Sequence, residues 1–291
     1  MKPSPFDYYS AGSVEEAITH LNEAGDEGLI IAGGQTLVPM LAMRLARPSV
    51  VIDINKVEAL KGINQTDDGL KISTCTRQNF ALKSPLVSEH APLLAKALPF
   101  VGHHQTRNRG TVGGSLAHGD PASEIPLVAV ALDAQITLRS PNQTRQVVAS
   151  EFFDGPMMTV REENECLTDV VFPVWRGQIG CGFQEVSQRH GDFAIVAAAA
   201  QISLDDNGVC EQIAISVGGV SGVPVRLKSA EDILTSNKLS KDLIGDALHN
   251  MASEIDPADD QQASAAYRRR VSKVMVERVI SEAVTNAGGS L

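Results

Sequence analysis

Apolar residues near the start of the chain recur at two different spacings. The first run has the spacing of one helix face, at Val14, Ala17, Ile18 and Leu21. Ser13 precedes this run, and Glu16 lies three residues after Ser13. This capping-box pattern predicts a helix starting at Ser13. Gly25 stands where a C-terminal cap belongs. The short apolar run over residues 28–32 instead predicts a buried strand.

The same two patterns alternate through the first 175 residues. Further strands are predicted at residues 50–54, 70–74, 135–138 and 165–172. Helices are predicted at residues 37–46, 91–100 and 125–132, with Pro92 at an early position of the second. The apolar pattern changes after the segment 173–177, which we interpret as a domain boundary.

The remainder of the chain predicts antiparallel strands followed by a helical tail. Strands are expected at residues 183–187, 195–204 and 209–217, and Asn207-Gly208 between the last two is a strong hairpin signal. One face of the tail helix carries Ala263, Tyr267, Val271, Val274 and Met275. The basic run 268–270 is interpreted as a solvated face, with contact to a partner as the alternative.

Composition limits the classes of function. The chain has 291 residues, of which 43% are hydrophobic and 21% charged, typical of a globular protein with two domains or subdomains. A net charge of −10 argues against a nucleic-acid surface. The longest apolar stretch, 193–200, is far shorter than the roughly 20 residues of a membrane span. The polar, proline-broken start lacks the apolar core of a signal peptide. We therefore expect no integral membrane segment and a cytoplasmic location.

The four cysteines are too dispersed to form a local metal site. They stand at Cys75, Cys166, Cys181 and Cys210, without any C-x-x-C pair. This spacing disfavours both a zinc or iron–sulfur site and a disulfide scaffold. We interpret all four as buried free thiols.

Two glycine motifs about eighty residues apart carry most of the chemical information. The first spans residues 31–39 around Gly33-Gly34, and the second spans residues 109–121 around Gly113-Gly114. Glycine pairs let main-chain N–H groups approach a ligand closely, and successive N–H groups form a concavity suited to anions. Thr36, Thr111 and Ser115 add hydroxyl groups, and Asp120 adds an acceptor. Either motif alone is typical of a tight turn, but together they could hold the two phosphates of one diphosphate-bridged cofactor.

Familiar catalytic and nucleotide motifs are absent. The sequence contains neither a Walker phosphate loop nor a G-x-S-x-G nucleophile elbow. Gly180-Cys181-Gly182 begins a Rossmann-like pattern, but Glu185 replaces the third glycine.

Three histidines and one aspartate could each have one of two roles. For His103-His104 we favour a loop or packing role over metal binding, and for Asp53 a structural role over ribose binding. For His118, within the second motif, contact with a cofactor and a structural role remain equally open. We name no catalytic residue and no metal ligand.

The glycine motifs also carry a family resemblance. Residues 32–39, 107–118, 120–124 and 183–194 closely resemble the FAD-binding medium subunit of molybdenum hydroxylases, the xanthine dehydrogenase and carbon monoxide dehydrogenase group. The resemblance spans nearly the whole chain. It implies an α+β protein with an FAD-binding PCMH-type (vanillyl-alcohol-oxidase-like) fold of two subdomains plus a C-terminal α+β domain. The implied FAD-binding domain covers residues 1–175, with subdomains of about 1–55 and 56–175, and the C-terminal CO dehydrogenase flavoprotein-like domain covers 176–291.

The resemblance also implies which residues bind FAD. The expected cofactor-binding residues are Ile31, Ala32, Gly33, Gly34, Gln35, Thr36, Leu37, Thr111, Gly113, Gly114, Ser115, His118, Asp120 and Leu167. Backbone groups of both motifs would hold the diphosphate, Asp120 would lie near the ribityl or ribose portion, and Leu167 would pack against the adenine. Glu185 and Asp192 fall in the segment that approaches the flavin in relatives, some of which carry Lys at the position of Glu185.

The function implied by the resemblance is electron transfer within a larger complex. Electrons from a molybdenum cofactor on a molybdopterin large subunit would pass through [2Fe–2S] clusters on an iron–sulfur small subunit to FAD on this chain, and then to an external acceptor. The implied assembly is a heterotrimer, further associated as a dimer of heterotrimers. The dispersed cysteines agree with this division because the chain cannot ligate iron–sulfur clusters itself. The alternatives are a stand-alone FAD-dependent reductase or oxidase and a cofactor-free assembly module.

Overall fold

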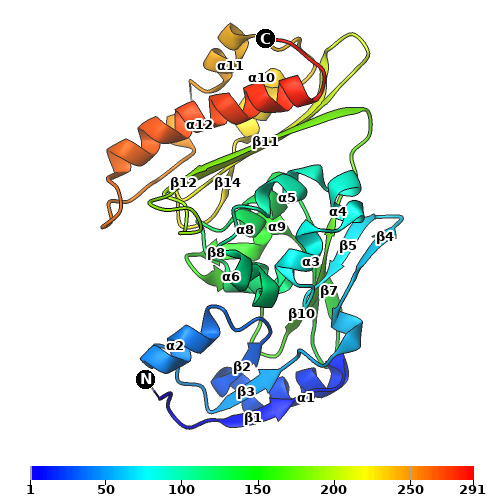
Figure 1. Cartoon of the computed structure of the whole chain (residues 1–291), viewed down its shortest axis with the longest axis vertical. Helices are drawn as coiled ribbons and strands as arrows, with labels where there is room; N and C mark the ends of the chain where they lie inside the picture. Colours follow the sequence, from blue (N-terminus) through cyan, green and yellow to red (C-terminus); the bar gives the residue numbers. More distant parts are fainter. Residues whose placement is uncertain (1, 250) are drawn as a thin grey trace.

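A computed structural model describes residues 2–249 and 251–291 of the chain. Three parts follow one another along the long axis of the molecule, with the N-terminal part at the bottom of Figure 1 and the C-terminal part at the top. Each part is built around its own sheet. The mixed helix and strand content agrees with the predicted α+β class.

The N-terminal part is a small parallel sheet with strand order β1-β3-β2, formed by Asp7–Ser10, Val50–Asp53 and Gly28–Ile31. Helix α1 (Val14–Ala24) buries its apolar face, and the predicted cap is present because Ser13 Oγ accepts from the Glu16 N–H at 3.1 Å. Helix α2 (Leu37–Met43) follows β2. The predicted order of helix, strand, helix and strand over residues 13–54 is confirmed, whereas β1 was not predicted.

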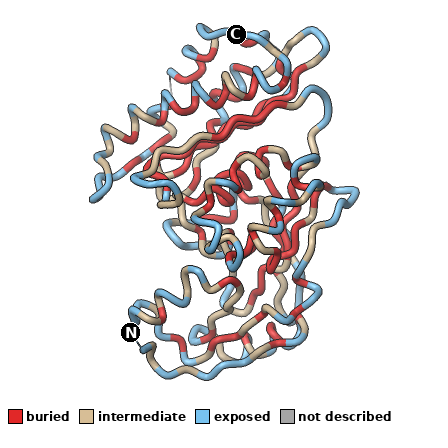
Figure 2. Tube along the Cα trace, in the orientation of Figure 1, coloured by how far each residue is buried: buried red, intermediate tan, exposed pale blue. Residues whose placement is uncertain are grey.

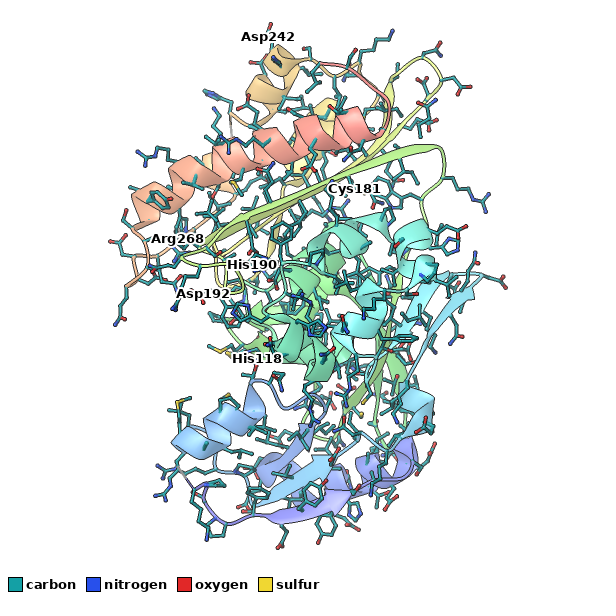
Figure 3. The ribbon with its side chains drawn as sticks, viewed as in Figure 1. His118, Cys181, His190, Asp192, Asp242 and Arg268 are labelled. Atoms are coloured by element: carbon teal, nitrogen blue, oxygen red, sulfur yellow. The ribbon has the colours of Figure 1, made fainter. Side chains whose placement is uncertain are left out.

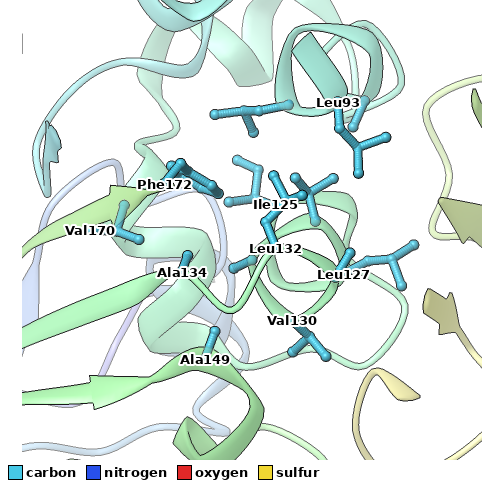
Figure 4. Close-up of a cluster of buried hydrophobic side chains, with 14 of the residues drawn as sticks. Leu93, Ile125, Leu127, Val130, Leu132, Ala134, Ala149, Val170 and Phe172 are labelled. Carbon is cyan, nitrogen blue, oxygen red and sulfur yellow. The ribbon is translucent and has the colours of Figure 1, made fainter. Parts of the chain in front are cut away.

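The middle part is an antiparallel sheet of order β4-β5-β10-β6-β7 with helices packed beside it. Its strands are Ile63–Thr66, Gly69–Ser73, Cys166–Phe172, Gln135–Arg139 and Thr144–Val148. The helices are α3 (Gln78–Leu82), α4 (Pro85–His90), α5 (Pro92–Ala97), α6 (His104–Arg109), α7 (Val112–His118), α8 (Glu124–Ala131) and α9 (Ala149–Phe152), followed by a β8–β9 pair at Phe153–Gly155 and Met158–Thr159. All residues of α8 are buried, and its apolar side chains pack with Leu93 and Phe172 in the core drawn in Figure 4.

The C-terminal part is an antiparallel sheet covered by the long helix α12 (Ala265–Asn286). Its strands β11–β14 are Gln178–Val186, Val196–Leu204, Cys210–Gly218 and Val225–Arg226, and helices α10 (Lys228–Leu234) and α11 (Lys241–Ala247) precede α12. Figure 2 shows buried residues concentrated in the strands beneath this helix. The predicted Asn207-Gly208 turn joins β12 to β13.

Two glycines of β11 explain the incomplete Rossmann-like motif. A Cβ atom on Gly180 would lie 1.9 Å from the Ala283 carbonyl oxygen, and one on Gly182 would lie 2.1 Å from that of Val279. The backbone of α12 therefore rests directly on the backbone of β11. The Gly180-Cys181-Gly182 segment is a packing motif here.

The buried face of α12 agrees with the predicted one at Tyr267, Val271 and Met275, which pack in the core, but not at Val274. Val274 is 43% exposed, whereas Arg268 is only 6% exposed. The face turned toward the sheet carries Arg268, Ser272, Met275, Val276, Val279, Ile280, Ala283 and Val284. The interpretation of the whole run 268–270 as a solvated face is therefore wrong for Arg268. The apolar pattern could not predict this burial, because the buried position is occupied by an arginine paired with Asp260.

Candidate functional site

A cavity of about 550 Å³ lies where the three parts of the chain meet. Thirteen of the fourteen expected cofactor-binding residues line it: 31–37, Thr111, Gly113, Gly114, Ser115, His118 and Leu167. Asp120 is absent from the lining, and its Oδ1 instead accepts from the Ala122 N–H at 2.8 Å. The structure thus brings both glycine motifs to one cavity.

The first motif is a loop with unused main-chain donors. Gly34 has a φ of 69°, in the left-handed region that favours glycine. In the described part of the chain, the N–H groups of residues 33–37 donate to no protein acceptor. Successive free N–H groups of this kind suit a diphosphate, whose charge they can hold without a cationic side chain.

A pair of polar residues at the end of β3 fixes this loop. Asn55 Nδ2 donates to the Ala32 carbonyl at 2.7 Å and to Asp53 Oδ1 at 2.6 Å, while the Tyr8 hydroxyl donates to Asp53 Oδ2. Burial alone would raise the pKa of Asp53, but the hydrogen bonds from Tyr8 and Asn55 outweigh it and lower the pKa. Asp53 is outside the cavity lining and has the structural role expected from the sequence.

The second motif is a helix start rather than a loop. Thr111 is the N-cap of α7, and its Oγ1 accepts from the Gly114 N–H at 3.0 Å. The N–H groups of Val112 and Gly113 donate to the carbonyls of Thr76 and Thr74, both at 3.0 Å. Its first donors are therefore already used within the protein. This motif offers the cavity a close backbone approach and hydroxyl groups, so the two motifs are not equivalent cradles.

Two cavity residues, Gln78 and Arg161, had no signal in the sequence. Gln78, at the start of α3, donates from Nε2 to Ser115 Oγ at 2.9 Å, and its buried Oε1 has no hydrogen-bond partner. Arg161 lies beside Cys166 and Leu167 in the lining and donates to the carbonyls of Glu162 and Glu165 at 2.8 and 2.9 Å. Among the described residues, Arg161 is the only Lys or Arg in the lining.

Carboxyl groups gather at the side of the cavity formed by the β11–β12 connection. Glu124 lines the cavity, and burial raises its pKa to about 7. Glu185 lies outside the lining, and its Oε2 is buried without a partner. Burial, followed by the charge of Glu124, raises the pKa of Glu185 to about 8.

Gly191, Asp192 and Phe193 complete this side of the cavity. In Figure 3 Asp192 and His190 lie on the same side of the molecule as His118. A Cβ atom on Gly191 would lie 2.6 Å from His103 Cε1, and the rings of His103 and His190 stack with centroids 6.4 Å apart. His103 therefore packs against the cavity wall, as expected for a packing role.

Metal sites, disulfides and membrane spans would point to other functions, and residues 2–249 and 251–291 bear on all three. That part of the chain contains no cluster of three or more His, Cys, Asp or Glu side chains able to hold a metal ion. All four cysteines are buried and free, as predicted. No helix within the same residues is long and apolar enough to cross a membrane.

Comparisons with known proteins agree with this geometry. Residues 4–175 match the FAD binding domain in molybdopterin dehydrogenase, and residues 182–283 match the CO dehydrogenase flavoprotein C-terminal domain. The chain is 40% identical over 287 residues to the 6-hydroxypseudooxynicotine dehydrogenase complex subunit alpha of Paenarthrobacter nicotinovorans, covering 99% of this chain and 97% of that one.

Solved structures give the same result. Carbon monoxide dehydrogenase from Hydrogenophaga pseudoflava matches with a TM-score of 0.95 and 32% identity, covering 98% of this chain and 99% of that chain. Quinoline 2-oxidoreductase from Pseudomonas putida 86 matches with a TM-score of 0.92 and 33% identity, covering 99% of both chains. The expected fold is thereby confirmed. The chain belongs to the family of FAD-binding medium subunits of molybdenum hydroxylases, with FAD as its cofactor.

Proposed function

We propose that this chain passes electrons from iron–sulfur clusters on a partner subunit through FAD to an external acceptor. The observation that carries the proposal is the loop 33–37. Its N–H groups have no protein acceptor, and its residues line a cavity that α7 and the β11–β12 connection also line. When bound, FAD supplies the redox chemistry, and the protein supplies its position and surroundings. No nucleophile or general acid of the chain is required.

The chain's own residues divide the work of holding the cofactor. The N–H groups of 33–37 would bind the diphosphate, and Thr111 and Ser115 of the second motif line the same cavity. Leu167 and Arg161 line the same part of the cavity, which suits the adenine end. Gly191, Asp192 and Phe193 line the cavity on the β11–β12 connection, where they would lie beside the flavin. We propose a division of the chain into domains 1–175 and 176–291 around this site.

The partners follow from the names of the relatives. Relatives of similar length are named as the medium chain of glyceraldehyde dehydrogenase, the medium subunit of nicotine 6-hydroxylase and the medium chain of carbon monoxide dehydrogenase. Their different substrates support a separate subunit for substrate oxidation. We propose an iron–sulfur small subunit and a molybdopterin large subunit as partners, associated as a dimer of heterotrimers. The four buried thiols favour a reducing compartment, so we place the complex in the cytoplasm.

Isolation of the native complex tests this function. We expect this chain to co-purify with two further polypeptides, and the complex to contain molybdenum, iron and FAD. Separation of the subunits should leave yellow colour with this chain and abolish substrate oxidation. A single metal-free chain with full activity would instead support a stand-alone FAD enzyme. A colourless chain that takes up no FAD would support an assembly module.

A further inference from the structure

Arg268 connects the C-terminal helix to two segments that form the cavity. It is the fourth residue of α12 and is 6% exposed. Its Nη1 donates to the carbonyl oxygens of Ile195 and Gly219, the latter at 2.8 Å, and its Nη2 donates to Asp260 Oδ2 at 2.6 Å. A guanidinium group suits this task because its planar fork of donors can bind several acceptors at once.

The Ile195 carbonyl ends the connection between β11 and β12. Gly191, Asp192 and Phe193 of this connection line the cavity, two to four residues before Ile195. Figure 3 shows Arg268 close to this connection, which carries His190 and Asp192. Fixing Ile195 therefore fixes the end of the segment that covers the cavity.

The Gly219 carbonyl leads to a second segment that lines the same cavity. The Gly219 N–H donates to the Pro121 carbonyl at 3.0 Å, and Ser123 and Glu124 of the adjoining segment line the cavity. Gly219 has a φ of 74°, and a Cβ atom there would lie 2.5 Å from the Ile195 oxygen. The backbones at Ile195 and Gly219 are thus in contact with each other where Arg268 binds the carbonyl oxygens of both.

Asp260 anchors the guanidinium group. Its Oδ1 accepts from the N–H groups of Gln262 and Ala263 at 2.8 and 2.9 Å. The backbone hydrogen bond from Ala263 and the hydrogen bond from Arg268 lower the pKa of Asp260, although its partial burial opposes the shift. The carboxylate is therefore charged at neutral pH. It lies in the segment before α12 and accepts a hydrogen bond from Arg268 in the first turn of that helix.

We propose that Arg268 is a positioning residue that holds the 191–193 segment and the 121–124 segment together at the cofactor cavity. It sets the geometry in which FAD binds without touching the cofactor. This inference depends on the proposed placement of FAD in the cavity.

The neighbouring Arg269 provides a matched control. It makes the same kind of contacts, from Nη1 to the carbonyls of Ala252 and Ile255 at 3.1 and 2.9 Å and from Nη2 to Asp256 at 3.5 Å. Those acceptors lie outside the cavity lining. Loss of Arg269, which is more exposed than Arg268, therefore reports the effect of losing arginine–carbonyl contacts away from the cavity.

The test compares Arg268→Met with Arg269→Met in the full chain. FAD is titrated into the apoprotein to give its Kd, visible circular dichroism reports the asymmetry around the bound flavin, and thermal unfolding reports stability. We expect Arg268→Met to weaken FAD binding by about tenfold or more and to reduce the flavin dichroism, because the binding segments lose their preorganisation. Arg269→Met should keep the wild-type Kd and spectrum.

Two milder variants keep the test decisive if Arg268→Met fails to fold. Arg268→Lys retains the charge but reaches fewer acceptors, and Asp260→Asn weakens the anchor, so each should show an intermediate Kd. The inference is overturned if the folded Arg268 variants bind FAD with wild-type Kd and spectrum, whatever their loss of thermal stability. A wild-type chain that takes up no FAD would overturn the proposed function as well, so the two failures are distinguished by the wild-type control.

Discussion

Gly33 and Gly110 bring the two glycine motifs into backbone contact. A Cβ atom on Gly33 would lie 2.8 Å from the Gly110 Cα and 2.5 Å from the Arg109 carbonyl oxygen. Neither neighbour is a flexible side chain that could turn away. The first loop and the residues before α7 therefore pack without room for a methyl group, and this contact sets the width of the cavity at that point.

Gly33→Ala should push the two motifs apart. We expect the variant to lose most of its FAD, and overpacking to lower the free energy of unfolding by about 1–3 kcal/mol. The ratio of flavin to protein absorbance and the thermal midpoint measure the two effects. Gly245→Ala in α11 is the control, because a Cβ atom there meets nothing within 4 Å. Full flavin content in Gly33→Ala would contradict the importance of this contact.

Gly114→Val should abolish FAD retention and leave the fold largely intact. A branched side chain here enters the cavity, and its Cβ atom would lie 2.7 Å from Thr111 Oγ1. Flavin absorbance and far-UV circular dichroism measure the outcome. Thr111→Val is the control that removes only the helix cap, and loss of the cap should lower the free energy of unfolding by about 1 kcal/mol. Normal flavin content in Gly114→Val would count against the placement of the cofactor beside α7.

Glu185→Gln should alter the dependence of stability on pH. The pKa of Glu185 in the folded chain is raised from 4.5 to about 8, so its stabilising contribution is complete below pH 4.5 and is lost as the pH rises through about 8. The variant should therefore gain about 1–2 kcal/mol relative to wild type between pH 5 and pH 9, less than the full shift because Glu185 is partly exposed.

Thermal midpoints measured from pH 5 to pH 9 would show this gain. Glu151→Gln, at an exposed position of α9, is the control and should follow the wild-type curve. Parallel curves for wild type and Glu185→Gln would show that Glu185 is ionised throughout this range.

The four thiols should resist alkylation in the folded chain. Burial raises the pKa of each cysteine to about 12, so the reactive thiolate is scarce at pH 8. We expect mass spectrometry to find no labelled cysteine after treatment with iodoacetamide, and four after unfolding. Rapid labelling of Cys166, which lines the cavity, would show that this wall opens in the absence of cofactor.

Local patterns predicted those elements that depend on local contacts. The Ser13 cap, strand β2 and the Asn207-Gly208 turn each follow from a few adjacent residues, and each was found. Helix α7 was not predicted because Gly113-Gly114 disfavours a helix. Carbonyl groups of Thr74 and Thr76, about forty residues earlier in the chain, accept its first N–H groups and allow the helix to start there.

The site also divides into residues that local sequence patterns indicate and residues that depend on distant contacts. The sequence placed both glycine motifs at one cavity through their resemblance to a family, but it gave no sign of Gln78, Arg161 or Arg268. Each of these residues acts through contacts that only the folded chain creates. Arg268 looked like its neighbours in a basic run, although the three arginines have different surroundings. Asp120 had the right chemistry, but its carboxylate caps the turn at Ala122.

The contact of Gly180 and Gly182 with α12 also bears on movement within the protein. The backbones of β11 and α12 are in direct contact over two helical turns, so strand and helix form one stiff slab. The guanidinium group of Arg268 connects the 191–193 segment to that slab through the Ile195 carbonyl. By contrast, the small parallel sheet contributes residues of β2, residues of α2 and the loop with unsatisfied donors to the cavity. Admission of so long a cofactor should therefore displace the N-terminal sheet and leave the C-terminal slab in place.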